Sequence, residues 1–413
     1  MTAPRRVGVV GAGVVGLSTA WFLQECGVEV TVLDRTGPGA GASWGNAGWI
    51  TPTLSTPLPE PSMLAHGLRQ LFRPSSPLYV PLAADVDLTR FLIRFARNST
   101  RGRWQAGMRK LVGINRLALD AFDALVDGGV DAVVREADPF VVGYTDPDAP
   151  QALLAEGREL AATGQPVTIE PLTVAQARET APILSENIRA ALHLGGQRYL
   201  DPPAFVAALA ESVAERGGLV KGGAEIAAVR DRADRVAVVG DGFDEEFDAV
   251  VLANGATLTS LAAAFGVRAQ VRAGRGYSFA VPADPMPSGP LYFPSGSVVC
   301  TPLGGHLRIA GMMEFRPHDA PLDPRRIEAV VASVRPYLRD VDLDDRRDEW
   351  VGSRPCTADG LPLIGRTMSP RVFVAGGHGM EGMTLGPATG RLLAQEICTG
   401  AVPYELAGFD PLR

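Results

Sequence analysis

Three glycines and one acid near the N-terminus have a spacing that suits dinucleotide binding. Gly11, Gly13 and Gly16 follow an apolar run at 6–10, and Asp34 ends the next apolar run. The first glycine permits a tight turn, the second lets the backbone approach a pyrophosphate, and the third lets a helix pack closely. Asp34 can accept hydrogen bonds from a ribose diol and disfavours a 2′-phosphate. The pattern predicts a dinucleotide site, and its alternative is a glycine-rich turn without a ligand.

Two strands and one helix must position these residues. Residues 6–10 and 28–33 are predicted to form buried parallel strands, and 14–27 has the apolar spacing of a helix. The first N–H groups of that helix lack partners and carry a partial positive charge, which suits phosphate oxygens. Strand, turn, helix, strand and acid come in the order that supports the motif.

Segments of nucleotide-binding type recur in the middle and at the end of the chain. A predicted strand at 249–252 runs into Asn254 and Gly255, and another at 372–375 precedes a glycine-rich turn and a helix at 385–397. The interleaving predicts one cofactor domain assembled from separate segments. A nicotinamide dehydrogenase, whose cofactor domain is usually contiguous, is a rival interpretation that this layout disfavours.

The other segments predict a second unit of a different kind. Further helices are predicted at 63–72, 87–98, 111–126, 150–163, 173–181, 204–216 and 325–337, and further strands at 140–144, 225–230, 236–240, 245–247, 277–281, 298–302 and 307–312. The fold class is therefore α/β, with a Rossmann-like domain interleaved with a mixed or antiparallel-sheet domain. The first domain is expected from 1–54, 191–267 and 349–413, and the second from 55–190 and 268–348.

Composition narrows the class of protein. The 413 residues are 46% hydrophobic and 21% charged, which is typical of a soluble globular protein. A net charge of −7 argues against nucleic acid as a partner. The four cysteines are far apart and form no metal-binding motif, so the sequence predicts a reducing compartment and no metal site. The first predicted strand begins close to Met1 and no apolar run could span a bilayer, so a cytoplasmic location is expected.

Four segments together resemble the FAD-dependent D-amino-acid oxidase superfamily over nearly the whole chain: 11–16 with Asp34, 41–48, 352–365 and 376–384. Within it, the chain is most similar to the bacterial D-amino-acid dehydrogenase small subunit and to glyphosate-oxidoreductase-like and glycine-oxidase-like enzymes. This closer similarity is carried by 43–48, 275–277, 307–311 and 377–379. The resemblance implies a Rossmann-like FAD-binding domain interleaved with a substrate domain.

The resemblance implies that backbone and small side chains bind FAD. A flat ring needs close approach of the backbone, which the small residues at 43–48 allow, and the start of the last helix can stabilise negative charge on the reduced flavin. Cys356 lies several residues from the position of the cysteine that carries the flavin in some sarcosine oxidases, so FAD is expected to be non-covalent. The residues expected to bind FAD are Gly11, Ala12, Gly13, Val14, Val15, Gly16, Asp34, Arg35, Ala42, Ser43, Asn46, Ala47, Gly48, Asn254, Gly255, Gly377, His378, Gly379, Met380, Gly382, Met383 and Thr384.

The resemblance also implies residues that handle the substrate. Arg354 lies in a Gly-x-Arg-Pro pattern and matches the arginine that clamps a substrate carboxylate, a task that suits the forked guanidinium. Tyr277 and His378 are the other catalytic candidates, with a core tyrosine and a packing histidine as their alternatives. The sequence shows no obvious general base. Glu381 stands where the related enzymes carry apolar residues, so it could shift the local potential or face solvent.

The implied reaction is FAD-dependent oxidative deamination of an amino acid, with a D-amino acid as the first candidate. A hydride would leave Cα for flavin N5, giving an imino acid that hydrolyses to a 2-oxo acid. The alternatives are oxidation of N-substituted glycines, such as sarcosine or glyphosate, and a non-catalytic flavin-binding electron-relay subunit. The implied electron acceptor is a quinone or oxygen. Arginines among apolar residues at 63–103 leave open a peripheral contact with the inner face of the membrane, with a helical cap over the pocket as the alternative.

Overall fold

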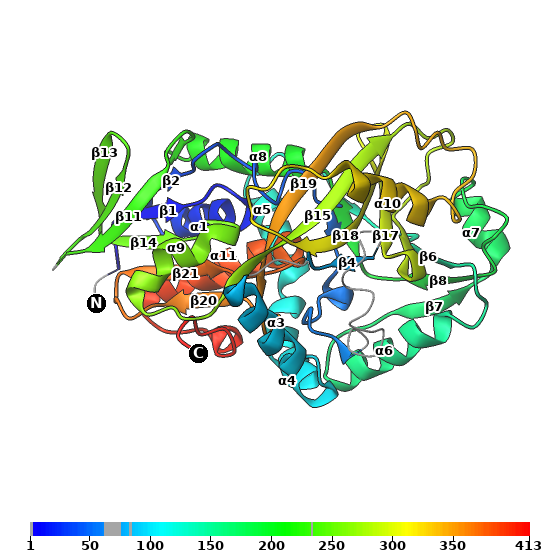
Figure 1. The fold of residues 1–413 in the computed structure, drawn as a ribbon. Helices are drawn as coiled ribbons and strands as arrows, with labels where there is room; N and C mark the ends of the chain where they lie inside the picture. The colour runs from blue at the N-terminus through cyan, green and yellow to red at the C-terminus, as the bar shows by residue number, and fades with distance from the viewer. Residues whose placement is uncertain (1–2, 62–75, 82–84, 233) are drawn as a thin grey trace.

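Two large sheets lie side by side in the molecule (Figure 1). This computed structural model describes residues 3–61, 76–81, 85–232 and 234–413. One sheet has six strands and carries the glycine-rich turns, whereas the other has nine strands. Among the described helices, none combines the length and the apolar character that crossing a membrane requires.

The six-stranded sheet is built from strands with apolar residues on both faces. Its order is β10 (Leu219–Lys221), β2 (Glu29–Leu33), β1 (Arg6–Val10), β14 (Ala249–Leu252), β21 (Val372–Gly376) and β20 (Leu363–Arg366). The first five strands pair in parallel, and β20 pairs antiparallel with β21. Side chains alternate between the faces, so Val7 and Val9 pack on one side and Val10 and Leu252 on the other.

Helices cover the face that carries Val7 and Val9. They are α1 (Val14–Glu25), α5 (Ala118–Asp127), α8 (Pro202–Glu215) and α11 (Gly382–Thr399). At the crossing of α1 and α11, a Cβ on Gly390 would lie 2.6 Å from the backbone nitrogen of Thr19. A glycine is therefore needed at this crossing, because the two backbones approach too closely for any side chain.

A small antiparallel sheet covers the opposite face. It consists of β11 (Ile226–Asp231), β12 (Val236–Gly240) and β13 (Phe243–Phe247), and α9 (Leu258–Ala262) packs in the same layer. The ring of Phe247 lies against Gly8, where a Cβ would come within 2.8 Å of it. The parallel sheet is thus buried on both faces, as its apolar strands require.

The nine-stranded sheet is mainly antiparallel. Its order is β19 (Arg347–Thr357), β15 (Val271–Val281), β18 (His306–Phe315), β17 (Val298–Leu303), β16 (Leu291–Phe293), β6 (Val141–Tyr144), β8 (Ala190–Leu194) and β7 (Ile169–Leu172), with β4 (Leu78–Tyr79) beside β18. The β16–β6 and β18–β4 pairs are parallel. The helices of this half are α6 (Pro150–Ala162), α7 (Val174–Thr180) and α10 (Pro324–Val334).

The described residues also form a second three-stranded sheet and two further helices. The sheet consists of β3 (Trp49–Ile50), β9 (Arg198–Leu200) and β5 (Val134–Glu136), and the helices are α3 (Val86–Asn98) and α4 (Arg101–Arg116). Short 3-10 turns are η1 (Pro52–Leu54), η2 (Gly255–Thr257), η3 (Ala263–Phe265), η4 (Pro294–Gly296) and η5 (Tyr404–Leu406).

The arginine-rich helix α3 turns its apolar side toward the protein. Phe91 and Phe95 are buried against Phe315 of β18, whereas Arg90 and Arg94 are exposed. This packing is that of a helical cap. Peripheral membrane contact stays a prediction, and the helix predicted at 63–72 lies outside the described residues.

The sequence and the structure differ in several boundaries. The single helix predicted at 111–126 is wrong, because α4 begins at Arg101 and ends at Arg116, and α5 follows. Glycines at 102 and 107 and several charged residues weaken the apolar spacing in the first half of α4. The predicted domain boundaries also differ from the boundaries of the sheets. They place most of β8 and β19 in the first domain, whereas both strands pair within the nine-stranded sheet. The division itself stays a prediction.

Candidate active site

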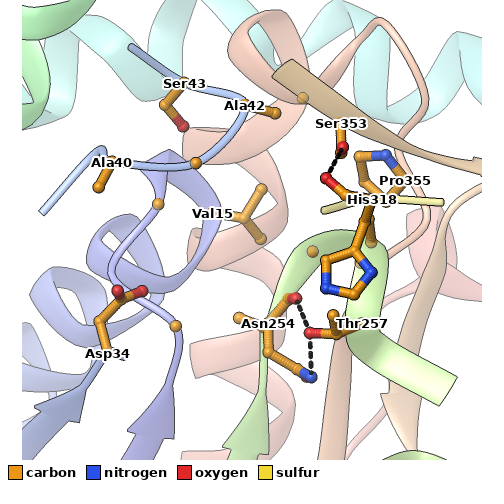
Figure 2. Close-up of a pocket in the computed structure, with 18 of the residues that line it drawn as sticks. Val15, Asp34, Ala40, Ala42, Ser43, Asn254, Thr257, His318, Ser353 and Pro355 are labelled. Carbon is orange, nitrogen blue, oxygen red and sulfur yellow. Dashed lines mark hydrogen bonds between the residues drawn. The ribbon is translucent and has the colours of Figure 1, made fainter. Parts of the chain in front are cut away.

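A cavity of about 500 Å³ opens where the parallel strands end, beside β19. Figure 2 shows its walls, with Asp34 at the end of β2, Ser43 on the loop that follows, and Asn254 after β14. Ser353 and Pro355 of β19 close another side. Ligands of open α/β sheets bind at this place, outside the carboxyl ends of the strands.

The three glycines of the first turn have different surroundings. Gly11 has a φ of +111°, and a Cβ there would lie 2.4 Å from the carbonyl oxygen of Ala253. A Cβ on Gly16 would lie 1.9 Å from the carbonyl oxygen of Gly11. The nearest atom to a Cβ on Gly13 is Ser43 Oγ, at 3.4 Å. The protein itself therefore needs glycine at 11 and 16, whereas Gly13 leaves room in the cavity.

Asp34 holds the glycine turn and the following loop. Its Oδ2 accepts the N–H of Ala12 at 2.9 Å, and its Oδ1 accepts the N–H groups of Thr36 at 2.8 Å and Gly37 at 3.0 Å. A carboxylate offers about four acceptor sites, so these bonds leave capacity for a ribose hydroxyl.

Two helices begin at the cavity. Gly13 is the N-cap of α1 and Glu381 that of α11, and among the described residues no side chain of either N-cap makes a capping bond. Ser43 Oγ accepts the N–H of Val14 at 3.3 Å. Helix starts present N–H groups and partial positive charge, which suits a pyrophosphate and the electron-rich edge of a reduced ring.

Asn254 supplies an acceptor that lacks a partner. Its Nδ2 donates to Thr257 Oγ1 at 3.1 Å, and that hydroxyl donates to the Asn254 carbonyl at 2.9 Å (Figure 2). Its Oδ1 is buried without a hydrogen bond within the described part of the chain. A buried oxygen of this kind on a cavity wall indicates a ligand that donates to it.

Arg354 of β19 enters the same cavity from the nine-stranded sheet. It is half-buried, and its Nη1 donates to the Met312 carbonyl at 3.3 Å. Among the described residues, no carboxylate lies within ion-pair distance of it. Burial lowers the pKa of Arg354, although nearby Cys356 and Glu381 oppose that shift. Its guanidinium stays charged, because the ordinary pKa of arginine is above about 12.

Gly276 of β15 makes the space that Arg354 fills. A Cβ there would lie 2.1 Å from Nη2 and 2.2 Å from Cζ of Arg354. The two residues lie on neighbouring strands, because Gly276 pairs with Gly352 and Gly274 pairs with Arg354. The guanidinium therefore rests directly over the backbone of β15. A guanidinium has five N–H donors, and the bond to Met312 uses only one of them.

Comparison with known proteins identifies the family. Residues 6–396 match the family model DAO, described as FAD dependent oxidoreductase. The chain belongs to this family. It is therefore an FAD-dependent oxidoreductase, and the predicted superfamily, fold class and cofactor are confirmed.

Three solved structures illustrate the shared fold. Glycine oxidase from Geobacillus kaustophilus is 24% identical over 99% of both chains, with a TM-score of 0.73. Iminodiacetate oxidase from Chelativorans sp. BNC1 is 19% identical over 98% of this chain and 99% of that one, with a TM-score of 0.70. L-α-glycerophosphate oxidase from Mycoplasma pneumoniae, with FAD bound, is 16% identical over 97% and 95%, with a TM-score of 0.73. The three enzymes are named for different molecules, so the shared fold alone does not identify the substrate of this chain.

The residues of this oxidoreductase suit FAD. Gly13 leaves room in the cavity, the two helix starts offer donors, and Asn254 Oδ1 can accept from a ribose or ring group. When bound, FAD supplies an acceptor for a hydride. The expected FAD residues that line the cavity are Gly11, Gly13, Val14, Val15, Asp34, Arg35, Ala42, Ser43, Asn46, Asn254, Gly255, His378, Gly379, Met380, Gly382 and Met383. The expected residues outside that lining are Ala12, Gly16, Ala47, Gly48, Gly377 and Thr384.

Several of the expected residues that do not line the cavity hold the loops of its wall in place. Gly48 has a φ of +78°, and a Cβ there would lie 2.0 Å from the carbonyl oxygen of Leu200. Asn46 Oδ1 accepts the Gly48 N–H at 2.8 Å, which fixes the loop. Thr384 Oγ1 accepts the N–H of Thr51 at 3.2 Å and so ties α11 to the chain after β3.

His378 reaches the cavity, and its side chain has a structural partner. Its Nε2 is hydrogen-bonded to Thr389 Oγ1 at 2.9 Å, and its backbone bridges to Cys356 of β19. Burial lowers the pKa of His378 to about 4, so the ring is neutral at pH 7. The Thr389 bond ties the ring to α11, and a catalytic role of His378 stays a prediction.

Tyr277 does not reach the cavity. It is fully buried in the core of the nine-stranded half, and its hydroxyl donates to Glu314 at 2.7 Å. Burial and Glu314 raise its pKa. Arg275 pairs with the same carboxylate at 3.2 Å. Side chains alternate along a strand, so Arg275 and Tyr277 share one face of β15 while Gly276 turns the other face toward Arg354.

His318 is a cavity residue that sequence reasoning missed. It lies on the loop after β18, and its carbonyl accepts the Ser353 hydroxyl at 3.0 Å (Figure 2). The contact joins residues 35 positions apart across two strands. Nothing local in the sequence marks it, because the loop reaches the cavity only through the pairing of the strands.

Proposed function

We propose that this oxidoreductase oxidises a small amine that carries a carboxylate, with a D-amino acid as the first candidate. The observation that carries the proposal is Arg354, a half-buried guanidinium in the FAD cavity that lacks a carboxylate partner among the described residues. A half-buried guanidinium that makes no ion pair within the described part of the chain and donates one bond to the Met312 carbonyl has donors left for an anion. A subunit that only relays electrons needs no such group.

Each residue has a distinct part in this reaction. Arg354 would grip the substrate carboxylate with two parallel hydrogen bonds, which fixes the direction in which Cα points. Gly276 keeps the guanidinium in place, and His378 holds the loop before α11. Oxidation of the carbon–nitrogen bond yields an imino acid, which water hydrolyses to a 2-oxo acid. N-substituted glycines present the same carboxylate and amine, and they form the second substrate class.

We also infer that FAD is held without a covalent bond. Cys356 is buried, and burial raises the pKa of its thiol to about 12. Its sulfur faces Gly274, where a Cβ would lie 2.6 Å from it. A protonated thiol is a poor nucleophile. The electron acceptor, a quinone or oxygen, stays a prediction from the sequence.

An anaerobic flavin-bleaching screen tests the proposal. The FAD-loaded enzyme is mixed with D- and L-alanine, glycine, N-methylglycine and, as a matched control, ethylamine, which lacks the carboxylate. We expect bleaching by carboxylate-bearing amines only. In Arg354→Ala, kcat/KM should fall by a transition-state cost of about 2–5 kcal/mol with FAD retained, and Arg354→Lys should recover part of it.

Two results would contradict the proposal. One is bleaching of the flavin by ethylamine as fast as by alanine, and the other is full activity in Arg354→Ala. Bleaching by D-alanine rather than L-alanine supports the first substrate class, and bleaching by N-methylglycine alone supports the second.

A further inference from the structure

An acidic side chain just outside the FAD cavity interacts electrostatically with Arg354. Glu381 directly precedes α11, and its Oε2 accepts the Ser55 hydroxyl at 2.6 Å. Its backbone N–H donates to the His378 carbonyl at 2.9 Å, and its carbonyl accepts the Leu385 N–H at 2.8 Å. Both backbone and side chain are thus fixed, so the carboxyl group has a defined position.

That position borders a second, small cavity next to the FAD cavity. It measures about 10 Å³, room for about one water molecule, and its walls include Glu381, Thr56, Leu58 and Cys356. His378, Gly379 and Met380 line both cavities. The Gly379 N–H donates to the Pro355 carbonyl at 2.8 Å, which clamps the loop of Glu381 to the strand of Arg354.

Four titratable groups face or adjoin Glu381. Arg354 on β19 lowers its pKa, and Glu60, on the segment after η1, raises it. His378 on the same loop is neutral, and burial keeps the Cys356 thiol on β19 protonated. Burial has the largest effect and raises the pKa of Glu381 to about 7. The carboxyl group therefore changes charge close to neutral pH.

We propose that Glu381 pairs with the ammonium group of the substrate and takes up its proton while Arg354 holds the carboxylate. This rests on the proposed function. A cation and an anion that interact with each other complement an amino-acid zwitterion. In the proton transfer, an N–H bond of the ammonium breaks and an O–H bond forms on Glu381, and no electrons leave the substrate. The amine is left neutral, with the free electron pair that its oxidation needs.

The competing explanation is that Glu381 only stabilises the start of α11. An acid at this place interacts favourably with the helix dipole. Glutamine at 381 would preserve the shape of the side chain and the bond from Ser55 but remove the charge. A role in proton uptake therefore predicts that the substitution changes the pH dependence of binding and reduction, whereas a purely structural role does not. A matched control is Glu396→Gln, because Glu396 is a buried acid on the same helix with a raised pKa and lies outside both cavities.

Acetate is the first probe, because it has a carboxylate and no amine. It is titrated into FAD-loaded wild type, Glu381→Gln and Glu396→Gln between pH 5.5 and 8.5, with binding followed by flavin absorbance. In wild type, acetate at Arg354 should bind about tenfold more weakly above pH 7 than below it, because ionised Glu381 repels it. Glu381→Gln should lose this dependence, and Glu396→Gln should keep it. Glu381→Asp, which retains the charge, should also keep it.

Anaerobic flavin reduction by the best amino acid of the screen is the second readout. The limiting rate of wild type should rise with pH through about 7, as Glu381 becomes able to take a proton. Glu381→Gln should lower that rate about 100-fold and remove the acidic limb. Identical pH profiles in wild type and Glu381→Gln, for acetate and for reduction, would overturn the proposal. If no amino acid reduces the flavin, the proposed function fails, and the acetate titration still decides whether Glu381 and Arg354 act on one anion.

Discussion

Glycine serves two different purposes in the two halves of this molecule. In the turn after β1, Gly13 leaves open space, and the nearest atom to a Cβ there is 3.4 Å away. In the β15–β19 pair, Gly276 leaves space that a protein group fills, because Arg354 Nη2 would lie 2.1 Å from its Cβ. We expect the first glycine to make room for the cofactor, and the second makes room for the side chain that we expect to hold the substrate.

Trp350 extends the second pattern across the boundary between the halves. A Cβ on Gly352 of β19 would lie 1.9 Å from its Cη2, and a Cβ on Gly45 of the 41–48 loop would lie 2.1 Å from its Cδ2. The Gly45 carbonyl also accepts the Ser278 hydroxyl at 2.9 Å. Glycines at this boundary therefore let an indole pack flat between a loop of one half and a strand of the other.

The largest effect should come from filling the space at Gly13. Gly13→Leu should fold, because the surrounding protein leaves room for a Cβ, and yet bind FAD at least about 100-fold more weakly, a loss of about 2.8 kcal/mol. FAD content is measured by absorbance after denaturation, which should release it from the wild type. Gly16→Leu is the contrasting variant and should fail to fold. Gly13→Leu with a full complement of FAD would contradict this use of the cavity.

A smaller effect should come from Gly276→Ala. The added methyl group would displace the Arg354 guanidinium while leaving the FAD loops untouched, so kcat/KM should fall about 100-fold with FAD content unchanged. Gly102→Ala in α4 is the matched control, because a Cβ there meets no atom within 4 Å. Wild-type kinetics in Gly276→Ala would show that the position of Arg354 does not limit the reaction.

Local patterns predicted the FAD-binding elements well. The strand predicted at 6–10 is β1 itself, the strand at 249–252 is β14, and the glycine turn stands between a strand and a helix as expected. These elements are apolar runs bounded by glycines, so neighbouring residues carry all the information. The prediction for Arg354 came from a resemblance in sequence, and the structure places that residue at the cavity.

Contacts between distant segments were not predictable in this way. Tyr277 was placed near the substrate, yet the pairing of β15 turns it toward Glu314 and the core. His318 reaches the cavity, and Ser55 reaches Glu381, from segments that are separate in sequence. For the same reason, the sequence showed no obvious base. The properties of Glu381 depend on Arg354, Ser55 and burial, and none of these is local in sequence.

The smallest effect concerns another acid with a raised pKa, the half-buried Glu156 in the nine-stranded half. Burial raises the pKa of Glu156 of α6 to about 7, and the neighbouring Glu60 and Glu159 add to the rise, whereas at Glu381 a cation, Arg354, opposes it. A carboxyl whose pKa is higher in the folded than in the unfolded chain stabilises the fold at low pH, and this contribution is lost as the pH rises through about 7. Glu156→Gln should therefore raise the free energy of unfolding by roughly 1–3 kcal/mol at pH 8 and change it little at pH 4.5.

Urea unfolding at both pH values measures the difference, with exposed Glu211→Gln on α8 as the control. An equal change at both pH values would mean that Glu156 acts through packing rather than through its charge.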